Sequence, residues 1–220
     1  MPARMPDAPV ILYLHGFASS AQSTKGTYLA ERLAEHGVTL KCPDFNRPDF
    51  TSMTMTRMLA QLDGELQDAR AATLIGSSLG GTLAVLAAGR WPERIGKLIL
   101  LAPAIMFAKE GHHLLPESRI AEWRRRGALP FFHFAYGEPR LLNVAFYEDS
   151  LQYDPFATEF QQPTLIFQGR RDQAVDPRTV ERFARGRANV TLTLVDDDHQ
   201  LVSSLPEIWK ATQSFLGLAE

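Results

Sequence analysis

The chain has 220 residues, 45% of them hydrophobic, which is enough for a single domain with a full core over residues 1–220. The formal net charge of −2 provides no extended basic surface, so no nucleic-acid partner is expected. No apolar segment occurs in the first nine residues and no run of about 18 apolar residues elsewhere, which argues against a standard export signal and a membrane span. Cys42 is the sole cysteine, which fits a cytoplasmic location, and no metal-ligand spacing is present.

Short apolar runs alternate with amphipathic segments along the chain. We expect strands at residues 10–14, 38–42, 72–75, 97–101, 164–167 and 190–195, and helices at 25–36, 54–69, 79–90, 177–185 and 200–216. This alternation predicts parallel strands with helices on both faces of the sheet. The predicted fold class is therefore α/β, with a minimal, doubly wound, mainly parallel six-stranded sheet.

A glycine-flanked serine marks the centre of the chain. The run Gly76-Ser77-Ser78-Leu79-Gly80 follows the strand expected at 72–75 and opens the helix expected at 79–90. Glycines two residues on either side of Ser78 permit a strand-to-helix turn too tight for side chains, with the serine oxygen at its apex. The short pattern alone is weakly specific, but in this setting it is typical of a nucleophile elbow, and Ser78 is the candidate nucleophile.

An acid and a histidine follow two later strands. Asp172 lies shortly after the strand expected at 164–167, and His199 lies after the strand expected at 190–195. A serine hydroxyl needs an imidazole to take its proton, and the imidazole needs a carboxylate to hold its tautomer. Because both residues follow strand ends at the same edge of a parallel sheet, they are the candidate acid and base for Ser78.

Asp176 is the alternative acid. It stands directly before Pro177, a position typical of a helix N-cap. Asp172 is preferred, because the acid usually follows directly after the turn at the strand end. The sequence leaves both carboxylates as candidates.

These motifs resemble those of the α/β-hydrolases, and specifically the compact bacterial predicted esterases that open with Tyr-Leu-His-Gly-Phe-x-Ser-Ser, here residues 13–20. The likeness continues through residues 75–81, through Ala102-Pro103-Ala104 and through the loops of Asp172 and His199. It assigns Ser78, Asp172 and His199 as the catalytic residues. In this architecture the main-chain amides of Phe17 and Leu79 form the oxyanion hole.

The chain departs from the family pattern at two places. One is the pair of acids at 172 and 176. The other is Asp196-Asp197-Asp198, which stands beside the histidine where relatives more often have glycine or asparagine.

The resemblance implies a cofactor-independent serine hydrolase without a metal, which cleaves small or medium acyl esters through an acyl-enzyme. An acyl thioesterase or a carbon–carbon bond hydrolase would use the same residues. Outside the enzymes, the alternative is a small-ligand receptor on the same fold. The oligomeric state stays open.

The segment 105–162 is too long for an ordinary connection and is rich in aromatic residues. We expect it to form a helical cap over an acyl pocket, with one helix beginning near the possible N-cap Ser118. Phe107 and Trp123 are the candidate substrate-binding residues. Simple packing of the insertion onto the core is the alternative for each of them.

Overall fold

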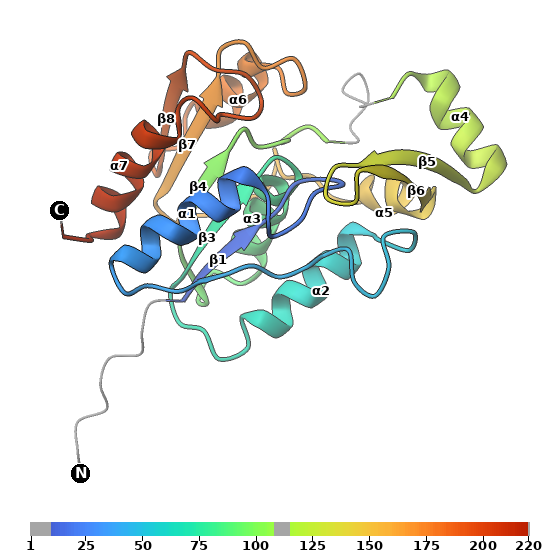
Figure 1. Ribbon diagram of the computed structural model, residues 1–220. Coiled ribbons are helices and arrows are strands. Elements are labelled where there is room, and N and C mark those ends of the chain that lie inside the picture. Colours follow the sequence, from blue (N-terminus) through green and yellow to red (C-terminus); the bar gives the residue numbers. More distant parts are fainter. Residues whose placement is uncertain (1–9, 108–114, 220) are drawn as a thin grey trace.

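The computed structural model describes residues 10–107 and 115–219 (Figure 1). The expectations for the first nine residues and for residues 108–114 of the insertion lie outside these ranges. Of the described helices, none is long and apolar enough to cross a membrane.

Six parallel strands form one sheet in the order β2-β1-β3-β4-β7-β8. In chain order they are β1 (Ile11–Leu14), β2 (Leu40–Lys41), β3 (Ala72–Ser77), β4 (Ile95–Leu101), β7 (Thr164–Gly169) and β8 (Val190–Val195). The chain steps from β1 to one side and then returns to the other side of β1, so the strand order reverses between β1 and β3. Ligands of open α/β sheets bind outside the carboxyl ends of the strands at such a point.

Helices cover both faces of this sheet (Figure 1). One face carries α1 (Thr24–Glu35) and α7 (Leu205–Leu216), and the other carries α2 (Met55–Glu65), α3 (Leu79–Arg90) and α6 (Pro177–Ala184). Both faces of strand β1 are covered by helices, which explains why its sequence is apolar throughout. Ile11 and Tyr13 pack with α1 and α7, whereas Leu12 and Leu14 pack with the helices of the other face.

Two helix boundaries differ from the sequence prediction by four or five residues, and the other differences are of one residue. Helix α7 begins at Leu205, not at residue 200, with Pro206 in its first turn, where proline is favoured. The residues before it form a loop, held by Asp197, whose carboxylate accepts hydrogen bonds from the Ser204 amide and hydroxyl. Helix α2 ends at Glu65, so residues 66–69, which were expected to be helical, lie outside it.

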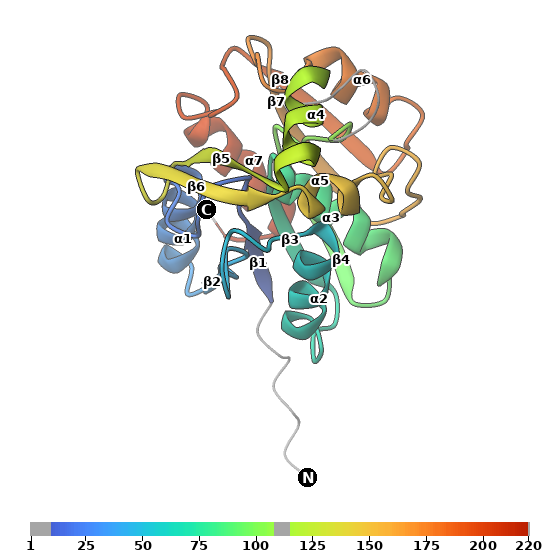
Figure 2. The same ribbon diagram turned by 90° about the vertical axis from the view of Figure 1, so that its right-hand side faces the viewer.

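The described part of the insertion contains strands as well as helices. It comprises α4 (Glu117–Arg126), the antiparallel hairpin β5 (Ala128–His133) and β6 (Glu138–Asn143), and α5 (Ala145–Ser150). The expectation of a helical cap was thus incomplete, and Ser118 lies inside α4, whose N-cap position is Pro116. The described part of the insertion lies at the carboxyl ends of the central strands (Figure 1 and Figure 2), where Phe131 and Phe146 pack on Phe17 of the loop after β1.

Candidate active site

Ser78 stands at the apex of the turn between β3 and α3. Its backbone has φ 52° and ψ −114°, a conformation that costs energy for a residue with a side chain. Four backbone hydrogen bonds hold it there. The Ser78 amide donates to Leu101 O at 2.9 Å, and Ser78 O accepts from the amides of Gly81 at 2.9 Å, Ala104 at 3.1 Å and Thr82 at 3.3 Å.

The glycines of the turn are required by close backbone approach. A Cβ at Gly76 would collide with Gly80 O, and a Cβ at Gly80 would collide with Leu14 O of the neighbouring strand. Both contacts are with backbone atoms, which cannot move aside cheaply. The steric reason expected from the sequence is confirmed.

We predict that Gly80→Ala prevents folding or lowers the free energy of unfolding by more than about 4 kcal/mol, because overlap with backbone must displace β1 or α3. Gly64→Ala in α2 is the control, since a Cβ there meets nothing within 4 Å. That change should raise stability by about 0.5–1 kcal/mol. Urea unfolding measures both, and a Gly80→Ala protein as stable as the wild type would refute the packing described above.

The structure brings Ser78, His199 and Asp172 together in one chain of hydrogen bonds. His199 Nδ1 lies 2.8 Å from Asp172 Oδ2, and His199 Nε2 lies 3.1 Å from Ser78 Oγ. A carboxylate can only accept, so Nδ1 carries the proton and Nε2 of the neutral ring accepts from the serine hydroxyl. In this tautomer the imidazole can take the hydroxyl proton.

Asp172 is buried and fully engaged. Its Oδ1 accepts from the amides of Ala174 at 2.9 Å and Val175 at 2.8 Å, and its Oδ2 accepts from Gln168 Nε2 at 2.8 Å in addition to His199. Burial by itself would raise the pKa of the Asp172 carboxyl, but the hydrogen bonds from His199, Val175 and Gln168 outweigh it and bring the pKa below its ordinary value. The group is therefore ionised where it meets the imidazole.

Asp176 occupies a different position. Its carboxylate accepts from the Arg178 amide at 3.0 Å and caps the N-terminus of α6, as the following proline suggested. Two carboxylates of the Asp196–Asp198 run also bind other groups, one in the loop after β7 and one in their own loop. Asp196 pairs with Arg171, and Asp198 accepts from the Gln200 amide.

The loop after β1 packs directly against the nucleophile turn. A Cβ at Gly16 would lie 3.4 Å from both Ser77 O and Ser78 Cβ, so the loop approaches the serine closely at the residue before Phe17. Leu79 is the first residue of α3, where amides have no partner within the helix. Their positions suit the expected donation from both amides to a developing oxyanion.

His15 holds this loop in place. Its Nδ1 donates to Gly16 O at 2.9 Å and its Nε2 accepts from the Phe45 amide at 3.1 Å. Burial lowers the pKa of His15, so the ring is neutral and suits this pair of bonds. His15 thus acts on loop structure and does not reach Ser78 in the hydrogen-bond chain.

A second buried network, which the sequence did not reveal, joins the same loop to the hairpin. Asn46 Nδ2 donates to Ser19 O at 2.9 Å, and Asn46 Oδ1 accepts from His133 Nε2 at 3.0 Å. The Phe134 amide also donates to Ala18 O at 2.8 Å. Local sequence patterns do not predict such hydrogen bonds, because their partners come from segments far apart in the sequence.

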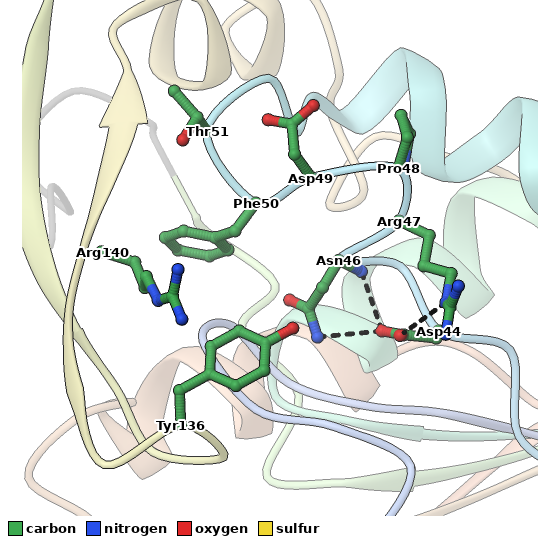
Figure 3. Close-up of a pocket in the computed structure, with 9 residues that line it drawn as sticks. All are labelled: Asp44, Asn46, Arg47, Pro48, Asp49, Phe50, Thr51, Tyr136 and Arg140. Carbon is green, nitrogen blue, oxygen red and sulfur yellow. Dashed lines mark hydrogen bonds and ion pairs between the residues drawn. The ribbon is translucent and has the colours of Figure 1, made fainter.

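A pocket of about 360 Å³ lies beside this network. Tyr136 and Arg140 of the hairpin face Asn46 and Phe50 of the loop after β2 across it (Figure 3). Neither Ser78 nor His199 lines this pocket, so it is separate from the serine hydroxyl.

The two candidate substrate-binding residues lie in different surroundings. Trp123 is 4% exposed, its Nε1 donates to Leu142 O at 2.8 Å, and its ring packs on Phe131 and Tyr147. Phe107 is half-buried and its ring lies 5.5 Å from that of Phe146. The contacts of Trp123 are within the insertion, which favours the packing alternative for this residue, whereas the role of Phe107 toward a substrate stays a prediction.

The described residues contain no group of three or more His, Cys, Asp or Glu side chains placed to hold a metal ion.

The parallel sheet, the strained serine turn and the hydrogen-bonded acid and histidine define a protein of the α/β-hydrolase fold, as expected. Residues 10–216 match the family described as Uncharacterised protein family (UPF0227), so the chain belongs to that family.

Solved structures with the same fold include Est1E from Butyrivibrio proteoclasticus with ferulic acid bound, at a TM-score of 0.81 and 22% identity over 98% of this chain and 91% of that one. Mouse alpha/beta hydrolase domain-containing protein 10 has a TM-score of 0.79 and 20% identity over 97% and 92%. The monoacylglycerol lipase of Paleococcus ferrophilus has a TM-score of 0.72 and 14% identity over 95% of each chain. At these identities the likeness establishes the fold.

One curated relative is the biotin biosynthesis bifunctional protein BioHC of Teredinibacter turnerae, 36% identical over 109 residues. The match covers 47% of this chain and spans 19% of the length of that protein.

Proposed function

We propose that this protein is a serine hydrolase that cleaves carboxylic esters of small or medium acyl chains through an acyl-enzyme. The observation that carries the proposal is the continuous hydrogen-bond chain from Ser78 Oγ through His199 to the buried Asp172 carboxylate. The occurrence of this fold in a monoacylglycerol lipase supports hydrolysis as the reaction class.

In the proposed reaction, Ser78 Oγ attacks the ester carbonyl while its proton passes to His199 Nε2. Asp172 stabilises the imidazolium that forms. The amides of Phe17 and Leu79 donate to the oxyanion of the tetrahedral intermediate. The intermediate collapses as the imidazolium gives its proton to the leaving alcohol, and water activated by His199 then releases the acid and regenerates the serine. No cofactor or metal takes part.

Two alternatives use the same residues. An acyl thioesterase or a carbon–carbon bond hydrolase would form an acyl-enzyme on the same serine but release a different leaving group, a thiol or a stabilised carbanion that is protonated. A small-ligand receptor would keep the pocket without an activated serine. The orientation of His199 toward Ser78 favours an enzyme, because a receptor has no need of a neutral imidazole accepting from that hydroxyl.

A fluorophosphonate probe tests the activated serine, since the probe phosphonylates only a serine whose proton can be removed. A panel of acyl esters and acyl-CoA thioesters of graded chain length, assayed on the purified protein, then separates ester from thioester hydrolysis. Failure of labelling over the pH range in which the protein stays folded would leave the receptor as the better proposal.

We also propose that the insertion selects the acyl chain. Phe107→Ala should lower the rate on an octanoate ester roughly tenfold relative to an acetate ester, because a contact along the longer chain is lost. Trp123→Ala should instead destabilise the protein by about 3–5 kcal/mol and affect both esters alike, since its ring is buried within the insertion. Rates on the two esters and urea unfolding of both variants measure this. Equal losses for Phe107→Ala on the two esters would contradict the selective role.

A cytoplasmic location remains part of the proposal and rests on the lone Cys42. Cell fractionation tests it.

A further inference from the structure

Lys25 is a buried lysine close to the candidate active site. It lies in the first turn of α1 and is 7% exposed, although lysine is almost never buried without partners. Its Nζ donates to Gln200 O at 3.0 Å and to His199 O at 3.3 Å. Both acceptors belong to the loop between β8 and α7, so the side chain joins the first helix of the chain to the loop that carries the imidazole.

The backbone of this loop needs such a partner. Leu201, directly after the two carbonyls, is buried and has φ 55°, in the left-handed region that disfavours residues with side chains. The turn directs the carbonyls of His199 and Gln200 toward the buried Lys25 side chain of α1. Hydrogen bonds to charged groups are stronger than neutral ones, so an ammonium suits this place.

We propose that Lys25 is a positioning residue for the reaction: by holding the carbonyls of His199 and Gln200, it keeps the imidazole in line between Ser78 and Asp172. The inference rests on the proposed function, in which His199 is the base. Lys25 acts through the loop backbone, because its Nζ binds the carbonyls and not the ring.

The charge of Lys25 gives this role a pH dependence. Burial lowers the pKa of Lys25 to about 8, and the negative charges of Asp172 in the β7–α6 loop and of Asp198 and Asp197 in the β8–α7 loop oppose that shift. The ammonium is therefore present below about pH 8 and lost above it. We expect kcat to fall on the alkaline side as the amine becomes neutral and the loop loosens.

The test compares Lys25→Met with Lys97→Met. Lys97 of β4 is the matched control, because its part-buried side chain also donates to a backbone carbonyl, Phe215 O, at 2.6 Å. This acceptor belongs to α7 and not to the loop that carries His199. Lys25→Met should lower kcat and the fluorophosphonate labelling rate roughly a hundredfold with little change in KM, as expected for a misplaced catalytic group. The alkaline fall should also disappear. Lys97→Met should change neither kcat nor the pH profile.

A second readout does not depend on catalysis. The proton between His199 Nδ1 and Asp172 should give a far-downfield NMR signal that His199→Gln removes. This signal should broaden or vanish in Lys25→Met and persist in Lys97→Met. If the wild type is not labelled but the signal behaves in this way, the proposed function fails, while the finding that Lys25 holds the imidazole against Asp172 stands.

Two results would overturn the role of Lys25. One is an unchanged downfield signal with a kcat equal to that of Lys97→Met. The other concerns Lys25→Arg, which keeps a charge at every accessible pH and serves if Lys25→Met does not fold. An alkaline fall in Lys25→Arg at the same pH as in the wild type would assign that fall to another group and contradict the inference.

Discussion

Replacing Ser78 with alanine should abolish fluorophosphonate labelling and lower kcat on acyl esters by on the order of 10⁴ to 10⁶, because no acyl-enzyme can form. The remaining acceleration would come from the oxyanion amides and substrate binding, which in comparable enzymes leave about 10³ to 10⁴ over water. The fold should survive, since Ser78 Oγ contacts only His199 among the hydrogen bonds of the described residues. Relief of the strained serine is not expected, because alanine has the same φ restriction.

Ser77→Ala is the matched control, one residue earlier in the same turn. Ser77 is buried and lies within reach of Tyr13, so its loss should cost about 1 kcal/mol of stability. Labelling and turnover should persist. A Ser78→Ala protein that still hydrolyses esters near the wild-type rate, with Ser77→Ala impaired, would show that the nucleophile has been assigned to the wrong residue.

Exchanging Asp172 for asparagine should lower kcat by on the order of 10⁴. An amide can present a donor to His199 Nδ1, which would then favour the tautomer with its proton on Nε2, unable to accept from Ser78. Asp176→Asn should leave kcat within about twofold, because asparagine caps a helix about as well as aspartate. Both variants make the same chemical change from aspartate to asparagine, so any difference in kcat between them comes from the position of the carboxylate.

Measuring kcat and KM for both variants across pH 5 to 9 distinguishes the outcomes. Asp172→Asn should also lose stability, since its carboxylate accepts four hydrogen bonds within the protein. The reduced pKa of Asp172 means that this contribution is present above the pKa of the unfolded carboxyl and is lost as pH falls through the lower folded pKa. If Asp176→Asn proved the more damaging change to kcat, Asp176 would be the acid.

Local sequence patterns were sufficient to propose Ser78, His199 and Asp172 as the candidate site residues. The glycines at 76 and 80 are recognisable from their spacing around Ser78, and the clash between a Cβ at Gly76 and Gly80 O involves residues only four positions apart, whereas the clash at Gly80 is with Leu14 O of a strand distant in the sequence. The acid and the histidine could be proposed because parallel strands deliver the residues after their ends to one edge of the sheet. Asp172 was preferred over Asp176 because it directly follows the turn at the strand end and because the proline after Asp176 indicates a helix N-cap, and the structure places Asp176 at the cap of α6.

The insertion was predicted less well. Aromatic content and helical spacing indicated α4, but the hairpin β5–β6 was not foreseen, because its alternation of apolar residues is short and includes Pro130 and Pro139. Trp123 illustrates the difficulty. Its place on one side of a helix predicted an apolar contact, and only the partners Phe131, Tyr147 and Leu142 O show that this contact lies within the insertion.

The sequence was therefore sufficient to predict the α/β architecture, the order of the six sheet strands and the helices between them, and the candidate site residues, because periodicity, glycine spacing around the serine and position after a strand end are local properties. Tertiary structure alone decided which distant groups meet. Lys25 reaches the carbonyls of His199 and Gln200 across more than 170 positions of the chain, and Asn46 joins Ser19 to His133 of the hairpin. Such pairs follow from the packing of whole elements, and no residue pattern near either partner contains that information.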